Sequence, residues 1–90
     1  MNTLNKIIKQ EIIKGINKTL KLRVGRDSDA ITSLISKEKG TIRIRMLTNL
    51  IEITIYPFTE TYPTRAHYDL NEPNSLENAI TKTITAFNQI

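Results

Sequence analysis

The chain has 90 residues, no cysteine and a formal net charge of +4 at pH 7. A chain this short supports one hydrophobic core, so we expect a single domain over residues 1–90, and the missing cysteines exclude disulfides and thiolate metal sites. No apolar run approaches the ~18 residues of a membrane span, and the N-terminus lacks the pattern of a secretory signal, so we expect a soluble, cytoplasmic protein.

The basic residues are concentrated at the N-terminal end. Residues 1–26 carry seven basic side chains and one acidic one, residues 27–56 are balanced, and residues 57–90 have a net charge of −2. This distribution predicts that an anionic partner is steered to the N-terminal region. The candidate binding residues there are Lys6, Lys14, Lys18, Lys21, Arg23 and Arg26.

Residues 4–14 have the pattern of an amphipathic helix, with an apolar stripe at Leu4, Ile8 and Ile12 that Ile7 and Ile13 widen, and with Lys6 and Lys14 pointing away from it. Gly15 then favours a helix end, and a helix that continued through it would lose about 1 kcal/mol. Its lysine-rich face indicates contact with phosphates or with an acidic protein surface, or simply solvation. Residues 20–24 alternate apolar and basic side chains, which predicts a half-buried strand with Lys21 and Arg23 on its polar side.

Residues 28–39 allow two interpretations. Polar residues at 27–29 resemble a helix start, and Lys37, Lys39 and Gly40 resemble a helix end, so we favour a short second helix. The competing interpretation is a strand with Ile31, Ser33 and Ile35 on one face, followed by a turn at Lys39–Gly40.

Residues 41–58, TIRIRMLTNLIEITIYPF, predict a hairpin with a two-residue turn at Thr48–Asn49. In this register Arg45 lies opposite Glu52 and Arg43 lies opposite Thr54, while a longer loop or a shifted register remains an alternative. The apolar side of the hairpin predicts the core residues Ile42, Ile44, Met46, Ile51, Ile53 and Ile55.

Prolines at 57 and 63 bracket a loop, and residues 65–70 are at best an edge strand, which is also a surface for pairing with a second copy. A final helix is expected after Asn74, with Glu77 completing a capping box. Its apolar stripe is Leu76, Ala79, Ile80, Thr83, Ile84 and Phe87. The predicted fold class is therefore α+β. It is a small antiparallel sheet of three to four strands, with an N-terminal helix, a short second helix and a C-terminal helix packed on one side.

The sequence does not favour an enzyme. His67 is the single histidine, and it shares a strand face with Arg65 and Asp69, a row that could bind or cleave a phosphodiester but is more typical of a solvated edge strand. The glycines are isolated and form no phosphate loop, and we expect no metal and no cofactor.

A basic sheet face is the better candidate site. If the strand at 20–24 joins the hairpin, then Lys21, Arg23, Arg43 and Arg45 share one face with Tyr56. Open sheet faces with cations and aromatic rings bind single-stranded nucleic acid. The alternative is a solvated face on which Glu52 neutralises one arginine.

Three segments, MNTLNKIIKQEI, TLKLRVGRDSDAITSLI and TAFN, resemble the small Cas9-inhibiting anti-CRISPR proteins of phages. The resemblance implies an N-terminal helix and strand packed on a small antiparallel sheet, and a strand at residues 30–36. Members of that family occupy the DNA-reading site of Cas9 with an acid-rich, DNA-mimicking surface. This chain has only four acids after residue 56 and is basic overall, so that mechanism is not carried over.

We therefore expect a non-enzymatic, phage-type inhibitor of a bacterial defence or nucleic-acid-processing complex, acting in the bacterial cytoplasm. Its partner would be a bacterial effector protein or ribonucleoprotein, of which Cas9 is one type, and a homodimer is compatible with the small core. The alternative is a small RNA- or DNA-binding domain that uses the basic sheet face.

Overall fold

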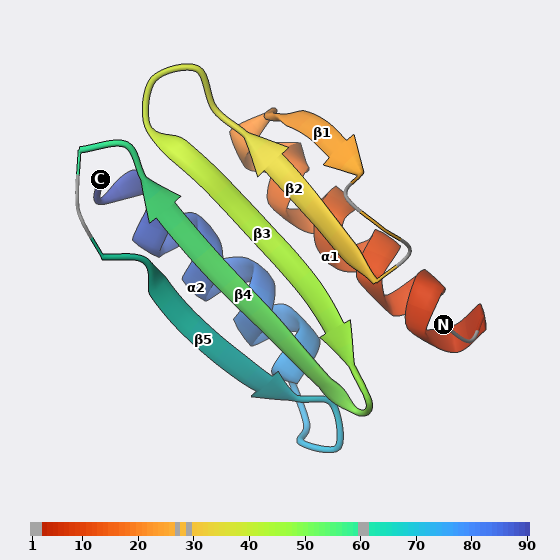
Figure 1. Cartoon of the computed structure of the whole chain (residues 1–90). Helices are drawn as coiled ribbons and strands as arrows, with labels where there is room; N and C mark the ends of the chain where they lie inside the picture. The colour runs from red at the N-terminus through yellow and green to blue at the C-terminus, as the bar shows by residue number, and fades with distance from the viewer. Residues whose placement is uncertain (1–2, 27, 29, 60–61) are drawn as a thin grey trace.

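The chain folds as a five-stranded antiparallel sheet with two helices on one of its faces (Figure 1). The computed structural model describes residues 3–26, 28, 30–59 and 62–90, with the side chain of Arg26 outside that description. The elements are α1 (Thr3–Leu20), β1 (Arg23–Arg26), β2 (Ile31–Ile35), β3 (Gly40–Leu47), β4 (Leu50–Pro57), β5 (Thr64–Asp69) and α2 (Ser75–Asn88). The α+β class is confirmed, but the sheet has five strands rather than three to four.

The strands follow one another across the sheet in the order β1-β2-β3-β4-β5, so each pairs with its neighbour in sequence. The core lies between the sheet and the helices. It includes Ile12 and Ile16 of α1, Phe87 of α2 and all six hairpin residues predicted to be buried. No helix within the described ranges is long and apolar enough to cross a membrane.

The predicted end of the first helix at Gly15 is wrong, because α1 continues to Leu20. A Cβ atom on Gly15 would lie 2.5 Å from Cδ1 of Ile80 on α2. The glycine therefore allows the two helices to approach each other closely, and this tertiary contact outweighs its poor helix propensity. At the other end of α1, Leu4 and Ile7 from the predicted stripe are 64% and 53% exposed.

Helix α1 ends through Lys21 and Asn17. Lys21 takes a left-handed conformation (φ 54°), and its N–H donates to the Asn17 carbonyl oxygen at 3.1 Å. The Asn17 side chain then pairs with the backbone of Leu22, accepting from its N–H and donating to its carbonyl, each at 3.0 Å. The strand predicted at 20–24 therefore starts later, at Arg23.

Residues 31–35 form strand β2, so the favoured helix for this segment is wrong and the competing strand is correct. Ser28 supports the strand start, because its Oγ accepts a hydrogen bond from the Ile31 N–H at 3.2 Å. Asp27 and Asp29, which contributed to the helix prediction, lie outside the described residues. Ile31, Leu34 and Ile35 have the spacing of a helical stripe, whereas only Ile31 and Ile35 share a strand face, and pairing with β3 decided between the two structures.

The turn between β2 and β3 is built by Ser36 and Gly40. Ser36 Oγ accepts hydrogen bonds from the N–H groups of Glu38 and Lys39 at 3.2 and 3.1 Å. Gly40 has φ 152°, and a Cβ there would collide with the carbonyl oxygen of Tyr56. The glycine that resembled a helix end therefore starts β3.

The β3–β4 hairpin has the predicted register throughout, from Leu47 opposite Leu50 to Thr41 opposite Tyr56. Asn49 in the two-residue turn has φ 56°, a left-handed conformation that asparagine tolerates better than most residues. The predicted edge strand is β5, which pairs with β4.

Helix α2 has the predicted apolar stripe, with Ala79, Thr83 and Phe87 buried. The predicted capping box is wrong, because Asn74 has φ 66° and makes no side-chain capping hydrogen bond to any described residue. Its carbonyl oxygen instead accepts from the Asn78 N–H at 2.9 Å.

Tyr68 connects β5 to α2. Burial raises the pKa of the Tyr68 hydroxyl above its ordinary value of 10.0, and a hydrogen bond from Thr83 opposes that rise in part. Because the folded state holds this proton more tightly than the unfolded chain, the contribution of the tyrosine to stability is complete below pH 10 and is lost as the pH rises beyond it.

We expect Gly15→Ala to lower the free energy of unfolding by about 1–2 kcal/mol, because crowding against Ile80 outweighs the helix propensity gained. In an Ile80→Ala background the same change should stabilise the chain by up to about 1 kcal/mol. Urea unfolding of the four variants measures both effects, and equal effects in the two backgrounds would contradict the contact.

We expect Tyr68→Phe to destabilise the fold by about 1 kcal/mol at neutral pH, because the hydrogen bond with Thr83 is lost. Above pH 10 the difference between the native chain and this variant should shrink, since the ionised tyrosine no longer favours the folded state. Urea unfolding across a pH series checks this, and a constant difference would contradict the assignment.

Candidate functional site

The face of the sheet opposite the helices, here termed the outer face, carries four of the nine predicted binding residues, which are Arg23, Arg43, Arg45 and Tyr56. Side chains alternate along β3, so Ile42, Ile44 and Met46 face the helices while Arg43 and Arg45 are exposed on the other side. The strand registers extend this face across the sheet. It includes Arg23, Ile31, Ser33, Ile35, Thr41, Arg43, Arg45, Glu52, Thr54, Tyr56, Arg65, His67 and Asp69.

Arginines lie along the middle of this face over small polar residues. Ser33, Arg43, Thr54 and Arg65 form one row across β2 to β5. Ser33 and Thr54 are only 5% and 2% exposed, although they lie away from both helices. Arg65 Nε donates a hydrogen bond to Thr54 Oγ1 at 3.4 Å. We attribute the burial of these small residues to the long arginine side chains beside them.

Arg43 also contacts the aromatic ring of the face. Its guanidinium carbon lies 5.4 Å from the centroid of the Tyr56 ring, within the range of a cation–π interaction. The two residues lie on neighbouring strands and in adjacent rows, because Arg43 is opposite Thr54 and Tyr56 is opposite Thr41. The predicted pair of a cation and an aromatic ring is therefore in direct contact.

Glu52 is the acidic centre of the next row. It lies between Arg45 of β3 and His67 of β5, as the registers require. Its carboxylate contacts the neighbours on β5, at 3.0 Å from His67 Nε2 and 3.9 Å from Arg65 Nε. His67 therefore pairs with Glu52, whereas Asp69 Oδ1 accepts from the Asn71 N–H at 2.9 Å. The predicted row of Arg65, His67 and Asp69 exists on β5. However, Arg65 and His67 contact Glu52 of β4, whereas Asp69 bonds to the backbone of Asn71.

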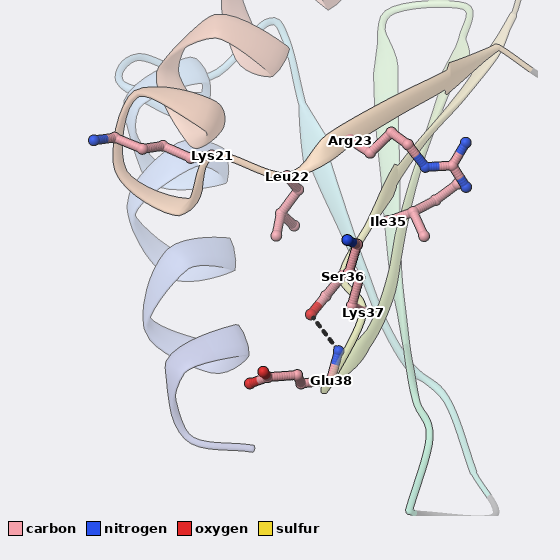
Figure 2. Close-up of a pocket in the computed structure, with 7 residues that line it drawn as sticks. All are labelled: Lys21, Leu22, Arg23, Ile35, Ser36, Lys37 and Glu38. Carbon is pink, nitrogen blue, oxygen red and sulfur yellow. Dashed lines mark hydrogen bonds between the residues drawn. The ribbon is translucent and has the colours of Figure 1, made fainter.

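One residue that was predicted for the basic sheet face, Lys21, does not lie on the outer face. Lys21 precedes β1 and points away from Arg23 (Figure 2), which corrects its predicted place on the basic sheet face. The side chain of Arg26 lies outside the described part of the structure. Arg23, Arg43, Arg45 and Tyr56 do share the face.

The helix lysines form a separate basic surface in the other layer. Lys6, Lys14 and Lys18 are exposed on α1, and Lys14 lies 4.0 Å from Glu11, one turn before it. An ion pair this exposed contributes little to stability. The predicted binding residues therefore fall on two surfaces, one on each layer of the molecule.

An open hollow of about 570 Å³ lies beside the outer face, at the start of β1 (Figure 2). Its apolar lining is Leu22 and Ile35, and its charged lining consists of three basic residues and Glu38. Because Arg23 belongs to both surfaces, the hollow extends the basic character of the outer face past the edge of the sheet. The basic lining residues are Lys21, Arg23 and Lys37.

Arg65 and His67 were predicted to share a strand face with each other, but not to lie on the same face as Arg43. The hairpin predicts which side of β4 carries Thr54, and adding β5 in antiparallel register to β4 brings Arg65 beside Thr54. The pairing of β5 with β4 could not be predicted, because the loop between them, bracketed by prolines at 57 and 63, does not indicate which strand β5 joins.

The described residues include no group of three or more histidine, cysteine, aspartate or glutamate side chains arranged to hold a metal ion. No protein-family model matches the chain, and searches of curated proteins and of solved structures return no match.

Proposed function

We propose that this chain is a non-enzymatic binding protein that holds a single-stranded nucleic-acid segment on its outer face. The observation that carries the proposal is the contact of Arg43 with Tyr56 on an open sheet face that also presents Arg23, Arg45 and Arg65. Arginines bind phosphate groups and aromatic rings stack on bases, which is the chemistry that single strands require.

The cations are spaced across the sheet in a way that supports this proposal. Arg23, Arg43 and Arg65 lie on β1, β3 and β5, and alternate strands are about 10 Å apart. Between them the outer face presents Ile35 on β2 and Tyr56 on β4. Arg23, Ile35 and Tyr56 belong to one row, and Arg43 and Arg65 belong to the adjacent row. A nucleic-acid segment lying along these two rows would therefore meet both positive charges and surfaces on which a base can rest.

A second candidate is the phage-type inhibitor of a bacterial defence or nucleic-acid-processing complex, which the anti-CRISPR-like segments imply. The observation that favours it is the basic surface of α1, with Lys6, Lys14 and Lys18 in the layer opposite the outer face. A short single strand bound across the outer face would leave the helical layer uncovered, whereas a large effector protein or ribonucleoprotein with acidic surfaces can enclose both layers.

We expect exchange of Arg43 and Arg45 for glutamine to weaken binding to labelled single-stranded homopolymers. The slope of log K against log salt should fall by up to about 1.4, because each phosphate contact to a single strand accounts for about 0.7. Fluorescence anisotropy over a salt series measures this, with circular dichroism to confirm folding.

The matched control exchanges Lys6 and Lys14 for glutamine, which removes the same charge from the helical layer. Its salt slope should stay close to that of the native chain. Equal losses for the two double variants would assign binding to net charge alone and would exclude the outer face as the site.

For the inhibitor candidate, we expect affinity capture from a bacterial lysate to retain one dominant protein after nuclease treatment. Exchange of the α1 lysines should reduce that capture if the helical surface contacts the protein partner. If every captured partner disappears with nuclease, nucleic-acid binding accounts for the interactions and the inhibitor candidate fails.

A further inference from the structure

The sheet has two edge strands, and they differ in their suitability for pairing with another strand. Strand β1 has four residues, RVGR, with a glycine and two charges of the same sign. Strand β5 has six residues, TRAHYD, without glycine, proline or lysine, and its charged residues Arg65 and Asp69 have opposite signs. Exposed edges are commonly blocked by lysine, proline or a short length, and β5 has none of these features.

The hydrogen bonds of β5 define which of its backbone groups point outward. The Leu70 N–H donates to the Asn49 carbonyl oxygen at 2.9 Å, which continues the register of β4 with β5. In an antiparallel pair, alternate residues direct their N–H and C=O groups at the partner strand. The backbone N–H and C=O groups of Ala66 and Tyr68 therefore point toward β4. Those of Arg65, His67 and Asp69 point outward, away from the sheet.

Symmetry limits how two copies of β5 can pair. Two identical antiparallel strands are related by a two-fold axis perpendicular to the sheet, and directly opposed residues point to the same face. An axis through His67 places it opposite itself and places Arg65 opposite Asp69 of the second copy, on both sides of the axis. Every outward-directed N–H and C=O group of β5 then lies opposite a hydrogen-bonding group of the second copy.

We propose that this protein forms a symmetric dimer in which β5 pairs antiparallel with β5 of a second copy, centred on His67. The two neighbouring registers fit less well. One places Arg65 opposite His67 and leaves Asp69 without an opposite charge. The other places His67 opposite Asp69 and leaves Arg65 without one. The register centred on His67 gives every outward backbone N–H and C=O group of β5 a hydrogen-bond partner. It also places Arg65 opposite Asp69 of the second copy twice. In Figure 1, β5 forms a margin of the sheet.

Dimerisation would join the two sheets with their outer faces on the same side, since the axis is perpendicular to the sheet. The arginines of the two copies would then form one surface. The dimer does not rest on the proposed nucleic-acid binding, because its argument uses only the backbone and the charges of β5.

The test exchanges the two charges of β5 separately and together. Sedimentation velocity over a concentration series should show the native chain in a monomer–dimer equilibrium. Arg65→Asp and Asp69→Arg should each weaken dimerisation by about tenfold or more, because each puts like charges opposite one another twice. The double variant R65D/D69R should recover the native dissociation constant to within about threefold, because the opposite charges are restored.

Hydrogen exchange on the native chain tests the register without any substitution, in case a variant does not fold. The amides of Arg65, His67 and Asp69 should become more protected as concentration rises, whereas those of Ala66 and Tyr68 should be protected at all concentrations. A chain that stays monomeric, odd-numbered amides that exchange rapidly in the dimer, or a folded double variant that fails to recover would each overturn the proposal.

Discussion

The pairing of β3 with β4 is the constraint on which both the apolar core and the outer face of this protein depend. Side chains alternate along each strand, so the register that buries Ile42, Ile44 and Ile53 against the helices also places Arg43 and Arg45 on the open side. A slip by one residue would exchange the two sets. The apolar core therefore positions the candidate binding face, although no core residue takes part in it.

The hairpin was predictable because its two strands are long, alternate strictly and are joined by two residues. The same local information also predicted the six core residues of the hairpin, the edge strand and the helical stripe of α2. These elements needed no knowledge of distant segments. Arg23, Arg43, Arg45 and Tyr56 were correctly grouped because their positions follow from alternation once the strands are known.

The errors came where distant contacts decide between local alternatives. Gly15 has the sequence pattern of a helix end, but a contact with Ile80, far along the chain, keeps it inside α1. Residues 31–35 suit a helix or a strand, and the hydrogen bonds of β3 select the strand. Lys21 continues the alternation of its neighbours, yet Asn17 and the left-handed turn remove it from the sheet.

Thr54 gives the outer face a property that a fully solvated face would lack. Arg65 is bonded to its hydroxyl, and Arg43 rests on the neighbouring ring of Tyr56, so both side chains are restrained in the free protein. Ordering a long side chain during association costs about 0.5–1.5 kcal/mol. Here part of that entropy is lost when the chain folds, and a ligand would meet arginines that are already partly preorganised.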